Sequence, residues 1–312
     1  MFELTGLDDP LRFCGQLDRN LSALETALPV VVRLDGERIH VRGASGAVAC
    51  AQAVLARMYD AAQSGAQVTP DDVALAARDV LGSEGLDGRT RALPKTLFVT
   101  QRGREIRPKT EGQRELTGAI ETHTLTFGIG PAGTGKTFLA MVMAVRALRA
   151  REITKIILAR PAVEAGEKLG FLPGDLKDKV DPYLRPLYDA LSELLDDSVV
   201  ARALERGTIE VAPLAYMRGR TLSDAYVILD EAQNATREQL KMFITRLGAN
   251  AKMIVVGDVT QIDLPRGVHP GLLDAPRLFG EIDDIAIVQL CERDVVRHPL
   301  IAKIVEAYAR ET

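Results

Sequence analysis

Residues 130–137 combine glycines, a lysine and a threonine in a spacing typical of a phosphate-binding loop. The segment fits the pattern G-x-x-x-x-G-K-[ST] at every fixed position. Glycines in such a loop let the backbone wrap closely around phosphate oxygens, because no Cβ blocks the unusual dihedral angles. Lys136 would neutralise β- and γ-phosphate charge, and the Thr137 hydroxyl would take one Mg²⁺ position. The predicted phosphate-binding residues are Gly130, Pro131, Ala132, Gly133, Thr134, Gly135, Lys136 and Thr137.

A pair of adjacent acids forms the second chemical signature. Residues 226–233 are an apolar run that ends in Asp230 and Glu231. Asp230 would hold Mg²⁺ directly or through water, and Glu231 can act as general base on the attacking water. The adjacent Glu favours a hydrolysing ATPase over most small-molecule kinases and GTPases, and the sequence contains no N-K-x-D motif for guanine. An ordinary strand with a charged turn is the alternative, which the upstream loop makes the weaker one.

Three further polar residues stand where nucleotide contacts are expected. Gln113 precedes the loop and resembles the glutamine motif of superfamily 1 helicases, where a side-chain amide reads the adenine edge. Gln261 follows a predicted strand at 252–257 and resembles helicase motif III, in which a Gln senses the γ-phosphate. Arg297 follows a predicted strand at 285–290 and is our candidate arginine finger, a contribution worth about 10³–10⁵ in turnover where one operates. Arg293 is the second choice for that role, and a salt-bridging arginine at a helix start is the structural alternative.

The elements around the loop predict how these residues are positioned. Residues 124–129 are short, β-branched and apolar, which favours a buried strand, and residues 138–148 are good helix formers. A strand–loop–helix unit aims the free N–H groups and the positive dipole end of the helix at an anion. With the predicted strands at 226–229, 252–257 and 285–290, we expect an α/β fold.

The first 85 residues predict a separate small α/β unit. We expect helices at 20–28, at 45–63 and from Pro70 onward, with Thr69 as N-cap, and strands at 29–33 and 38–42. Helix, two strands, helix resembles a KH-like domain, and KH domains clamp RNA with a GXXG loop. Residues 15–18 are the corresponding stretch here, but Asp18 replaces the second glycine, and an acid there would repel phosphate. A module for protein contacts or assembly is the alternative, and the sequence leaves both open.

Residues 89–114 form a basic connector within a chain whose net charge is −4. Two acids, Glu105 and Glu111, stand against eight basic residues, and residues 97–100 predict one strand. The segment would either bind along the backbone of a polyanion, with an affinity that falls steeply with salt, or serve as a solvated linker. The basic residues are Arg89, Arg91, Lys95, Arg102, Arg104, Arg107, Lys109 and Arg114.

Composition indicates an ordinary globular protein of a reducing compartment. The three cysteines, Cys14, Cys50 and Cys291, lie far apart and form no C-x-x-C pair, which argues against a zinc site or a disulfide framework. The N-terminus has no basic and apolar leader, and no run of 18 apolar residues occurs. We therefore expect a cytoplasmic location and no membrane association.

Several segments together resemble the PhoH-like ATPases, and in particular their KH-bearing, YbeZ-type bacterial branch. The resemblance is specific from residue 108 to 310 and looser over residues 1–85. It implies a single RecA-like P-loop core, with a mainly parallel sheet and helices on both faces, that is related to superfamily 1 helicases. It also implies roles in RNA metabolism and phosphate-starvation responses, and partnership with the endoribonuclease YbeY. The segments that carry the resemblance are residues 160–175, 181–188, 213–222, 230–233, 257–261 and 294–300.

These observations predict three parts: a KH-like domain at 1–88, a basic linker at 89–110 and a PhoH-like ATPase domain at 111–312. Because the ATPase domain has room for only one RecA-like lobe, Arg297 would act on a neighbouring copy, in a ring-like homo-oligomer such as a hexamer. Arg160, Lys168, Arg218 and Arg220 are predicted on loops outside strands, where they would contact RNA or an adjacent subunit.

The predicted function is Mg²⁺-dependent hydrolysis of ATP, coupled to RNA binding, remodelling or unwinding. The predicted catalytic residues are Lys136, Asp230, Glu231, Gln261 and Arg297, and Thr137 and Asp230 are the predicted metal ligands. Two alternatives belong to other classes. One is a protein-remodelling ATPase that acts on an endoribonuclease or ribosomal partner without moving along RNA. The other is a scaffold in which ATP only orders the assembly.

Overall fold

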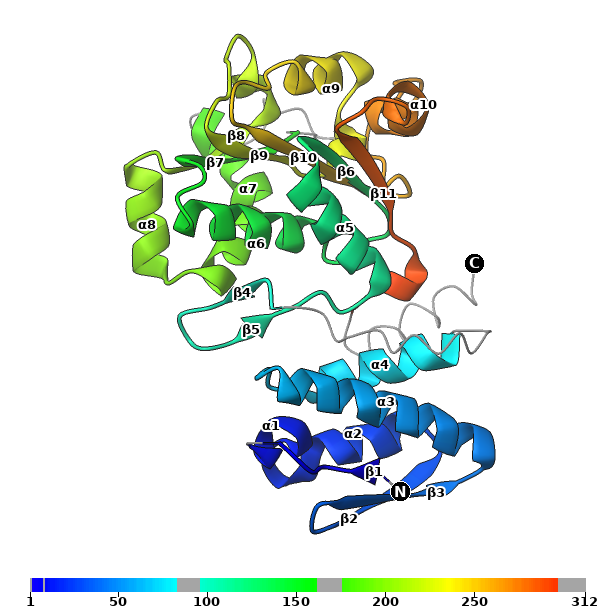
Figure 1. The fold of residues 1–312 in the computed structure, drawn as a ribbon. Helices are drawn as coiled ribbons and strands as arrows, with labels where there is room; N and C mark the ends of the chain where they lie inside the picture. The colour runs from blue at the N-terminus through cyan, green and yellow to red at the C-terminus, as the bar shows by residue number, and fades with distance from the viewer. Residues whose placement is uncertain (1, 8, 83–95, 162–175, 297–312) are drawn as a thin grey trace. The chain divides into compact units, whose positions relative to one another are not determined.

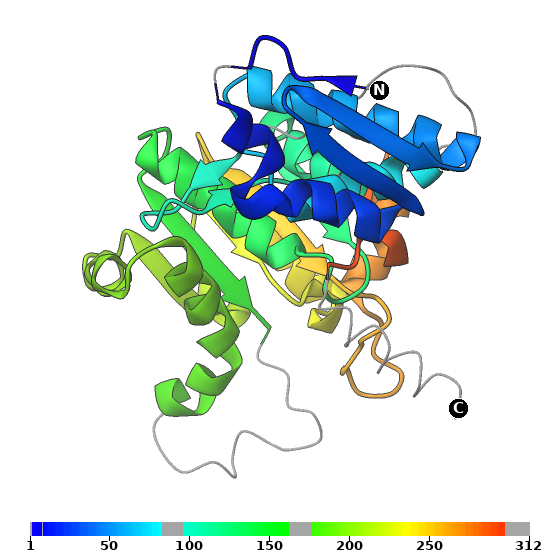
Figure 2. The same cartoon turned by 90° about the horizontal axis from the view of Figure 1, so that it is seen from below.

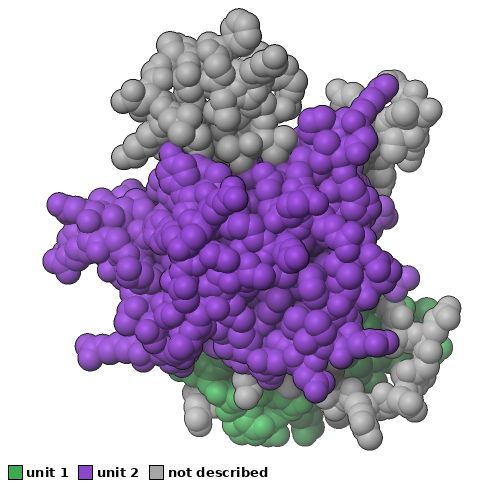
Figure 3. Space-filling view, turned by 90° about the horizontal axis from the view of Figure 1, so that it is seen from above, with its two compact units in different colours: residues 1–95 green, residues 96–312 purple. Residues whose placement is uncertain are grey.

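The chain folds into two compact units in a computed structural model, residues 1–95 and residues 96–312, which Figure 3 colours separately. The structure describes residues 2–7, 9–82, 96–161 and 176–296. Residues 96–110, which we assigned to the linker, belong to the second unit by their contacts. The predicted domain limits at 88 and 110 stay predictions. No helix in the described ranges is long and apolar enough to cross a membrane.

The first unit packs helices with a three-stranded antiparallel sheet of order β1-β3-β2. Its predicted helices and strands are present, whereas α1 and β1 were not predicted. The β2–β3 hairpin contacts α3 and turns through Gly36, which has a φ of +60° (Figure 2). The Thr69 hydroxyl accepts a hydrogen bond from the Asp72 amide at 3.3 Å, which confirms the predicted cap. The elements are β1 Phe2–Glu3, α1 Pro10–Cys14, α2 Arg19–Ala27, β2 Val30–Asp35, β3 Arg38–Gly43, α3 Ser45–Gln63 and α4 Pro70–Gly82.

The loop between α1 and α2 has an unusual backbone. Leu17 and Asp18 both have a φ of +55°, in the left-handed region that side chains with a Cβ rarely adopt. Asn20 is fully buried, and its amide nitrogen donates to the Phe13 carbonyl at 2.7 Å and to the Val68 carbonyl at 2.9 Å. These two hydrogen bonds tie the start of α2 to the end of α1 and to the segment before α4.

The second unit is built on a six-stranded, fully parallel sheet of order β11-β6-β10-β9-β7-β8. Parallel strands covered on both faces are expected to be continuously apolar, and β6 and β9 are buried at every position. The predicted α/β class is therefore confirmed. The strands are β6 Leu125–Ile129, β7 Lys155–Arg160, β8 Ile209–Pro213, β9 Ala225–Leu229, β10 Lys252–Gly257 and β11 Ile285–Gln289.

Helices cover both faces of this sheet, as Figure 1 shows, and each face has its own apolar core. The alternation along β9 separates the two cores: Tyr226 and Ile228 face one, and Val227 and Leu229 face the other. The first core takes side chains from α5 Glu111–Thr122, α6 Lys136–Arg149, α7 Leu176–Leu194 and α8 Asp197–Glu205. The second core takes side chains from α9 Arg237–Ile244 and α10 Ala275–Phe279.

A small residue in β6 lets α5 approach the sheet closely. A Cβ at Gly128 would lie 3.0 Å from a methyl group of Leu116 on α5 and 3.2 Å from Val256 on β10. Thr126 faces the same side and is 1% exposed. The strand that leads into the phosphate-binding loop is thus held between a helix and the neighbouring strand without room for larger side chains.

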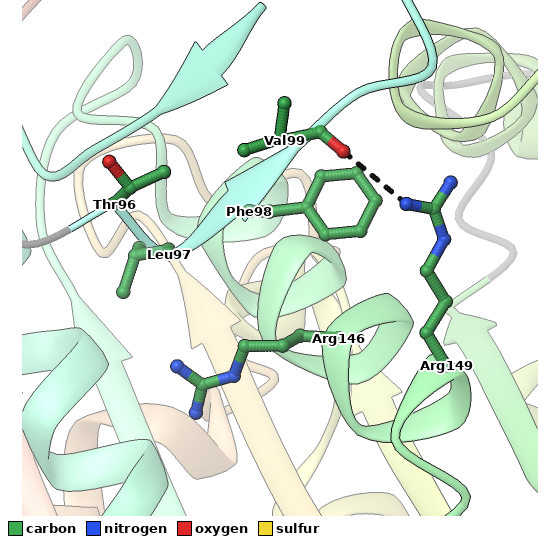
Figure 4. A pocket seen from close by; sticks show the side chains of 6 residues that line it. All are labelled: Thr96, Leu97, Phe98, Val99, Arg146 and Arg149. Atoms are coloured by element: carbon green, nitrogen blue, oxygen red, sulfur yellow. Dashed lines mark hydrogen bonds between the residues drawn. The ribbon is translucent and has the colours of Figure 1, made fainter. Parts of the chain in front are cut away.

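Residues 96–106 form a hairpin of β4 Phe98–Val99 and β5 Glu105–Ile106, where we predicted one strand inside a linker. Phe98 and Ile106 are buried in the core that α6 also lines. Arg149 of α6 lies over the Phe98 ring at 4.4 Å and donates to the Val99 carbonyl at 3.3 Å (Figure 4). These contacts make the described part of the hairpin an integral piece of the second unit. The open pocket beside it is lined by Thr96, Leu97, Phe98, Val99, Arg146 and Arg149.

Candidate active site

The loop at 130–137 connects β6 to α6, and three of its positions require glycine for their backbone conformation or for lack of space. Gly133 and Gly135 have φ angles of +85° and +79°. Gly130 is required for another reason, because a Cβ there would lie 2.5 Å from the Leu290 carbonyl oxygen at the end of β11. Gly135 is the N-cap of α6, so the free N–H groups of this helix face the loop.

Lys136 is buried, and its ammonium group is held by the loop itself. Its Nζ donates to the carbonyls of Gly130 at 2.6 Å and Pro131 at 2.8 Å. Burial lowers the Lys136 pKa, and the nearby carboxylates of Asp258, Glu231 and Asp230 oppose that shift. A positive charge at the mouth of the loop is what a polyphosphate requires.

Thr137 and Asp230 are 93 residues apart in the chain and share a hydrogen bond. The Thr137 hydroxyl donates to Asp230 Oδ1 at 2.6 Å. Burial raises the Asp230 pKa, and the hydrogen bond from Thr137 opposes this rise. The neighbouring Glu231 carboxylate raises the pKa further. The two predicted metal ligands are therefore next to each other, at the carboxyl ends of parallel strands where ligands of α/β sheets bind.

Glu231 follows Asp230 in a left-handed conformation with a φ of +52°. A non-glycine residue in this region carries a backbone cost of about 1–3 kcal/mol, and such residues cluster at functional sites. Its Oε1 lies 3.4 Å from the Arg160 guanidinium, which also lies 3.8 Å from Asp230 Oδ2. Arg160 thus pairs with both acids of the site.

The placement of Arg160 corrects our prediction that it lies on a loop outside the strands. Arg160 is the last residue of β7, and its side chain turns to the neighbouring strand β9 because parallel strands end at the same edge. Arg220 forms a forked pair with Glu210 at 2.6 and 2.7 Å, so its charge is used within the unit. Arg218 is exposed, and Lys168 lies outside the described residues.

Strand β10 lies between the loop strand β6 and the acid-bearing strand β9, so the residues after it reach both. Asp258 accepts a hydrogen bond from the Ala132 amide of the loop at 2.8 Å through Oδ2. Burial would raise the Asp258 pKa, but hydrogen bonds from Thr260 and Ala132 outweigh it and hold the pKa below its usual value. We had not singled out Asp258. Its position directly after an apolar strand, like that of Asp230, was the signal available.

Gln261 lies near Glu231 but is linked to it through a residue that we had not predicted. Its backbone carbonyl accepts a hydrogen bond at 3.0 Å from Gln233, which is 1% exposed. Gln233 also donates to Glu231 Oε2 at 2.5 Å. The Gln261 side chain itself is exposed.

Gln113 is buried near the start of α5, and its amide contacts the phosphate-binding loop. Its Nε2 donates to the Thr134 carbonyl at 2.9 Å, and its Oε1 accepts from the Lys109 amide at 2.6 Å. Each of these atoms can form one more hydrogen bond. Beyond these bonds to described residues, the amide keeps one N–H and one lone pair that could pair with the acceptor and the donor of an adenine.

The segment that leads to Arg297 is hydrogen-bonded to the start of α5 and to the phosphate-binding loop. Asp294 accepts from the Gly112 amide at 3.0 Å, and the Val296 amide donates to the Gly133 carbonyl at 2.9 Å. Arg293 is exposed. Arg297 lies outside the described residues, but the residue before it is bonded to the phosphate-binding loop of its own chain.

The structure therefore brings Lys136, Thr137, Asp230 and Glu231 together. Thr134 links Gln113 to Lys136, and Gln233 links Gln261 to Glu231. Among the described residues, no group of three or more His, Cys, Asp or Glu could hold a metal ion. All three cysteines are free. The site thus offers a phosphate cradle, two hard oxygen donors and a carboxylate beside them.

Comparison with known proteins identifies close relatives. A family model described as PhoH-like protein matches residues 105–309. A PhoH-like protein of Mycobacterium tuberculosis H37Rv is 50% identical over 296 residues, which cover 95% of this chain and 84% of that protein. A PhoH-like protein of Bacillus subtilis 168 is 50% identical over 309 residues, covering 99% and 97%. Protein PhoH of Escherichia coli K12 is 48% identical over 206 residues, covering 65% of this chain and 58% of that protein.

Proposed function

The chain belongs to the PhoH-like protein family, and we propose that it hydrolyses ATP to ADP and phosphate with Mg²⁺. The observation that carries this proposal is the 2.6 Å hydrogen bond from Thr137 to Asp230, with Glu231 next in the chain. This hydrogen bond joins the phosphate-binding loop after β6 to the pair of acids after β9, although β10 lies between these two strands. A loop that only binds phosphate needs no such pair, whereas hydrolysis needs a metal ligand and a base.

Each residue has a distinct part in this reaction. The loop amides and Lys136 bind and neutralise the β- and γ-phosphates. Glu231 removes a proton from the attacking water, and Gln261 contacts the γ-phosphate. Asp258 holds the loop in shape through the Ala132 amide.

The residues at the site fit Mg²⁺. This ion prefers oxygen ligands and is usually held by one or two carboxylates together with substrate phosphates, without a cage of protein ligands. Thr137 and Asp230 supply a hydroxyl and a carboxylate side by side, and no acidic cage occurs in the described ranges. Bound Mg²⁺ would neutralise charge that develops on the phosphates.

We further propose that turnover is coupled to RNA. Support comes from the first unit, in which residues 15–18 join two helices beside a β1-β3-β2 sheet, an arrangement compatible with the KH-like domain that we expect there. Remodelling of a protein partner, such as an endoribonuclease or a ribosomal protein, is the second candidate. The left-handed Asp18 favours it, because a carboxylate in that loop opposes phosphate binding.

A homo-oligomer is part of the proposal, because a single core lacks a second lobe to complete the nucleotide site. Mixing a Lys136→Ala chain with an Arg297→Ala chain tests it, since each supplies what the other lacks. Restored turnover in the mixture supports an arginine that acts in trans. No restoration, together with an inactive Arg297→Ala chain, places the arginine in cis, as the Val296–Gly133 hydrogen bond would allow.

ATP turnover with and without single-stranded RNA tests the proposed function. We expect Mg²⁺-dependent phosphate release that Lys136→Ala abolishes, and stimulation by RNA that weakens steeply with salt. Turnover without any RNA effect favours the protein-remodelling candidate. ATP binding without turnover under all these conditions favours the scaffold and contradicts the proposed function.

A further inference from the structure

Gln233 is a fully buried amide that links three parts of the site. Its Oε1 accepts a hydrogen bond from the Asp258 amide at 2.9 Å, and its Nε2 donates to Glu231 Oε2 at 2.5 Å and to the Gln261 carbonyl at 3.0 Å. It lies in the short 3₁₀ turn Ala232–Asn234 that follows β9. One side chain therefore connects the end of β9 to the end of β10.

The orientation of this amide follows from its partners. A backbone N–H only donates and a backbone carbonyl only accepts, so the oxygen must face Asp258 and the nitrogen must face Gln261. Both N–H groups of Gln233 are then used, one of them on the Glu231 carboxylate. A hydrogen bond to a charged oxygen is among the stronger ones and fixes the rotamer of the carboxylate that receives it.

The surroundings leave Gln233 little freedom to move. A Cβ at Gly257 would lie 2.7 Å from Gln233 Oε1 and 3.0 Å from its backbone nitrogen. The closeness of this approach explains the glycine at the end of β10. The Gln233 side chain is therefore clamped between strand ends, which is what a rigid support for a base requires.

We propose that Gln233 is a positioning residue that holds the Glu231 carboxylate in its working orientation and fixes its position relative to the Gln261 segment. The inference rests on the proposed function, since it assigns Gln233 a role in the hydrolysis step. Arg160 holds the other oxygen of Glu231, so the two side chains grip the carboxylate from both sides. Among the described residues Gln233 forms no hydrogen bond to the phosphate-binding loop or to Lys136 and reaches the loop only through Asp258, so we expect it to affect turnover much more than nucleotide affinity.

The test is a double-mutant cycle with Gln233→Met and Glu231→Gln, measured as ATP turnover and as the affinity for a fluorescent ATP analogue. Methionine has a similar length and no amide. We expect Gln233→Met to lower kcat by roughly 10- to 100-fold, the range typical of residues that orient a ligand, with analogue affinity within about threefold. In the Glu231→Gln background the same change should add almost nothing, because the carboxylate that it orients is gone.

Gln52→Met is the matched control, because Gln52 is exposed on α3 in the other unit, and it should leave all readouts unchanged. Additive losses in the cycle, a parallel fall in analogue affinity, or wild-type kcat for Gln233→Met would overturn the inference. If Gln233→Met lacks a cooperative unfolding transition, Gln233→Glu replaces it, since it keeps the acceptor for Asp258 and removes both donors. A wild-type chain without any turnover would instead refute the proposed function.

Discussion

Arg160 and Glu231 lie on neighbouring parallel strands, and the arginine guanidinium is 3.4 Å from the glutamate carboxylate. The same arginine is 3.8 Å from Asp230, so one cation balances two adjacent acids. The Mg²⁺ ion that we propose for this site would serve the same electrostatic purpose as Arg160 at this edge of the sheet. This relationship leads to a prediction about stability.

Arg160→Gln should lower the free energy of unfolding in EDTA by about 1–3 kcal/mol, because it leaves the buried Asp230 and the half-buried Glu231 without this cation. Added Mg²⁺ should then raise the melting temperature of the variant more than that of the wild type, since the ion no longer competes with an arginine. Thermal unfolding with EDTA and with Mg²⁺ measures both effects. Arg220→Gln is the control, since it removes an arginine–carboxylate pair with Glu210 of β8 that involves neither Asp230 nor Glu231. An equal Mg²⁺ effect in all three proteins would contradict this prediction.

Thr126→Val should stabilise the protein. The Thr126 hydroxyl is buried in β6 and has no hydrogen-bond partner among the described residues. Valine has the same shape without the unsatisfied oxygen, so we expect a gain of about 1 kcal/mol in the free energy of unfolding. Denaturant titration measures it. Thr117→Val is the control, because the Thr117 hydroxyl donates to the Gln113 carbonyl at 3.0 Å, and it should give no gain. A destabilised Thr126→Val protein would show that the hydroxyl is satisfied after all.

The Glu210–Arg220 pair should make stability depend on pH in the acid range. The hydrogen bond from Arg220 holds the Glu210 pKa below its ordinary value of 4.5. A lowered folded-state pKa gives stability that is present above the ordinary pKa and is lost as the pH falls through the folded-state value. Because both side chains are about one-third exposed, we expect Glu210→Gln to cost only about 0.5–1 kcal/mol at neutral pH. The difference from wild type should vanish in acid. A difference that persists at low pH would contradict the ion-pair origin.

Gln113→Ala should reduce the preference for ATP over GTP. The variant loses the loop contact to Thr134 as well as the adenine contact, so affinity for both nucleotides should fall. The loss should be about tenfold larger for ATP, because only adenine matches the remaining donor and acceptor of the amide. Competition binding with both nucleotides gives the ratio. Equal losses for ATP and GTP would show that Gln113 only holds the loop.

Elements whose residue types within a few positions are distinctive could be predicted from the sequence. The phosphate-binding loop, the β-branched strand before it and the acids after β9 follow from residue types within a few positions. The very short β1 and α1 were not predicted, since two and five residues are too few for a periodicity. The hairpin at 96–106 was predicted as one strand because its basic residues indicated a linker, yet Arg107 is buried and paired with Glu105.

The missed residues depend on the order of strands in space. Gln233 and Asp258 acquire their roles because β10 lies between β6 and β9, an order that the chain order does not reveal. Arg160 was expected in a loop, whereas the end of β7 places it beside β9. Side chains that act across strand ends can be predicted only once the sheet order is known.

ATP turnover by the Glu231→Gln protein, measured beside ATP binding, tests whether Glu231 is the general base for ATP hydrolysis. Glutamine keeps the size of the side chain and removes its basicity, so turnover should fall by at least about 10²-fold while ATP still binds within a few-fold of wild type. We expect loss of turnover with retained ATP binding. A Glu231→Gln protein that hydrolyses ATP at the wild-type rate would contradict it.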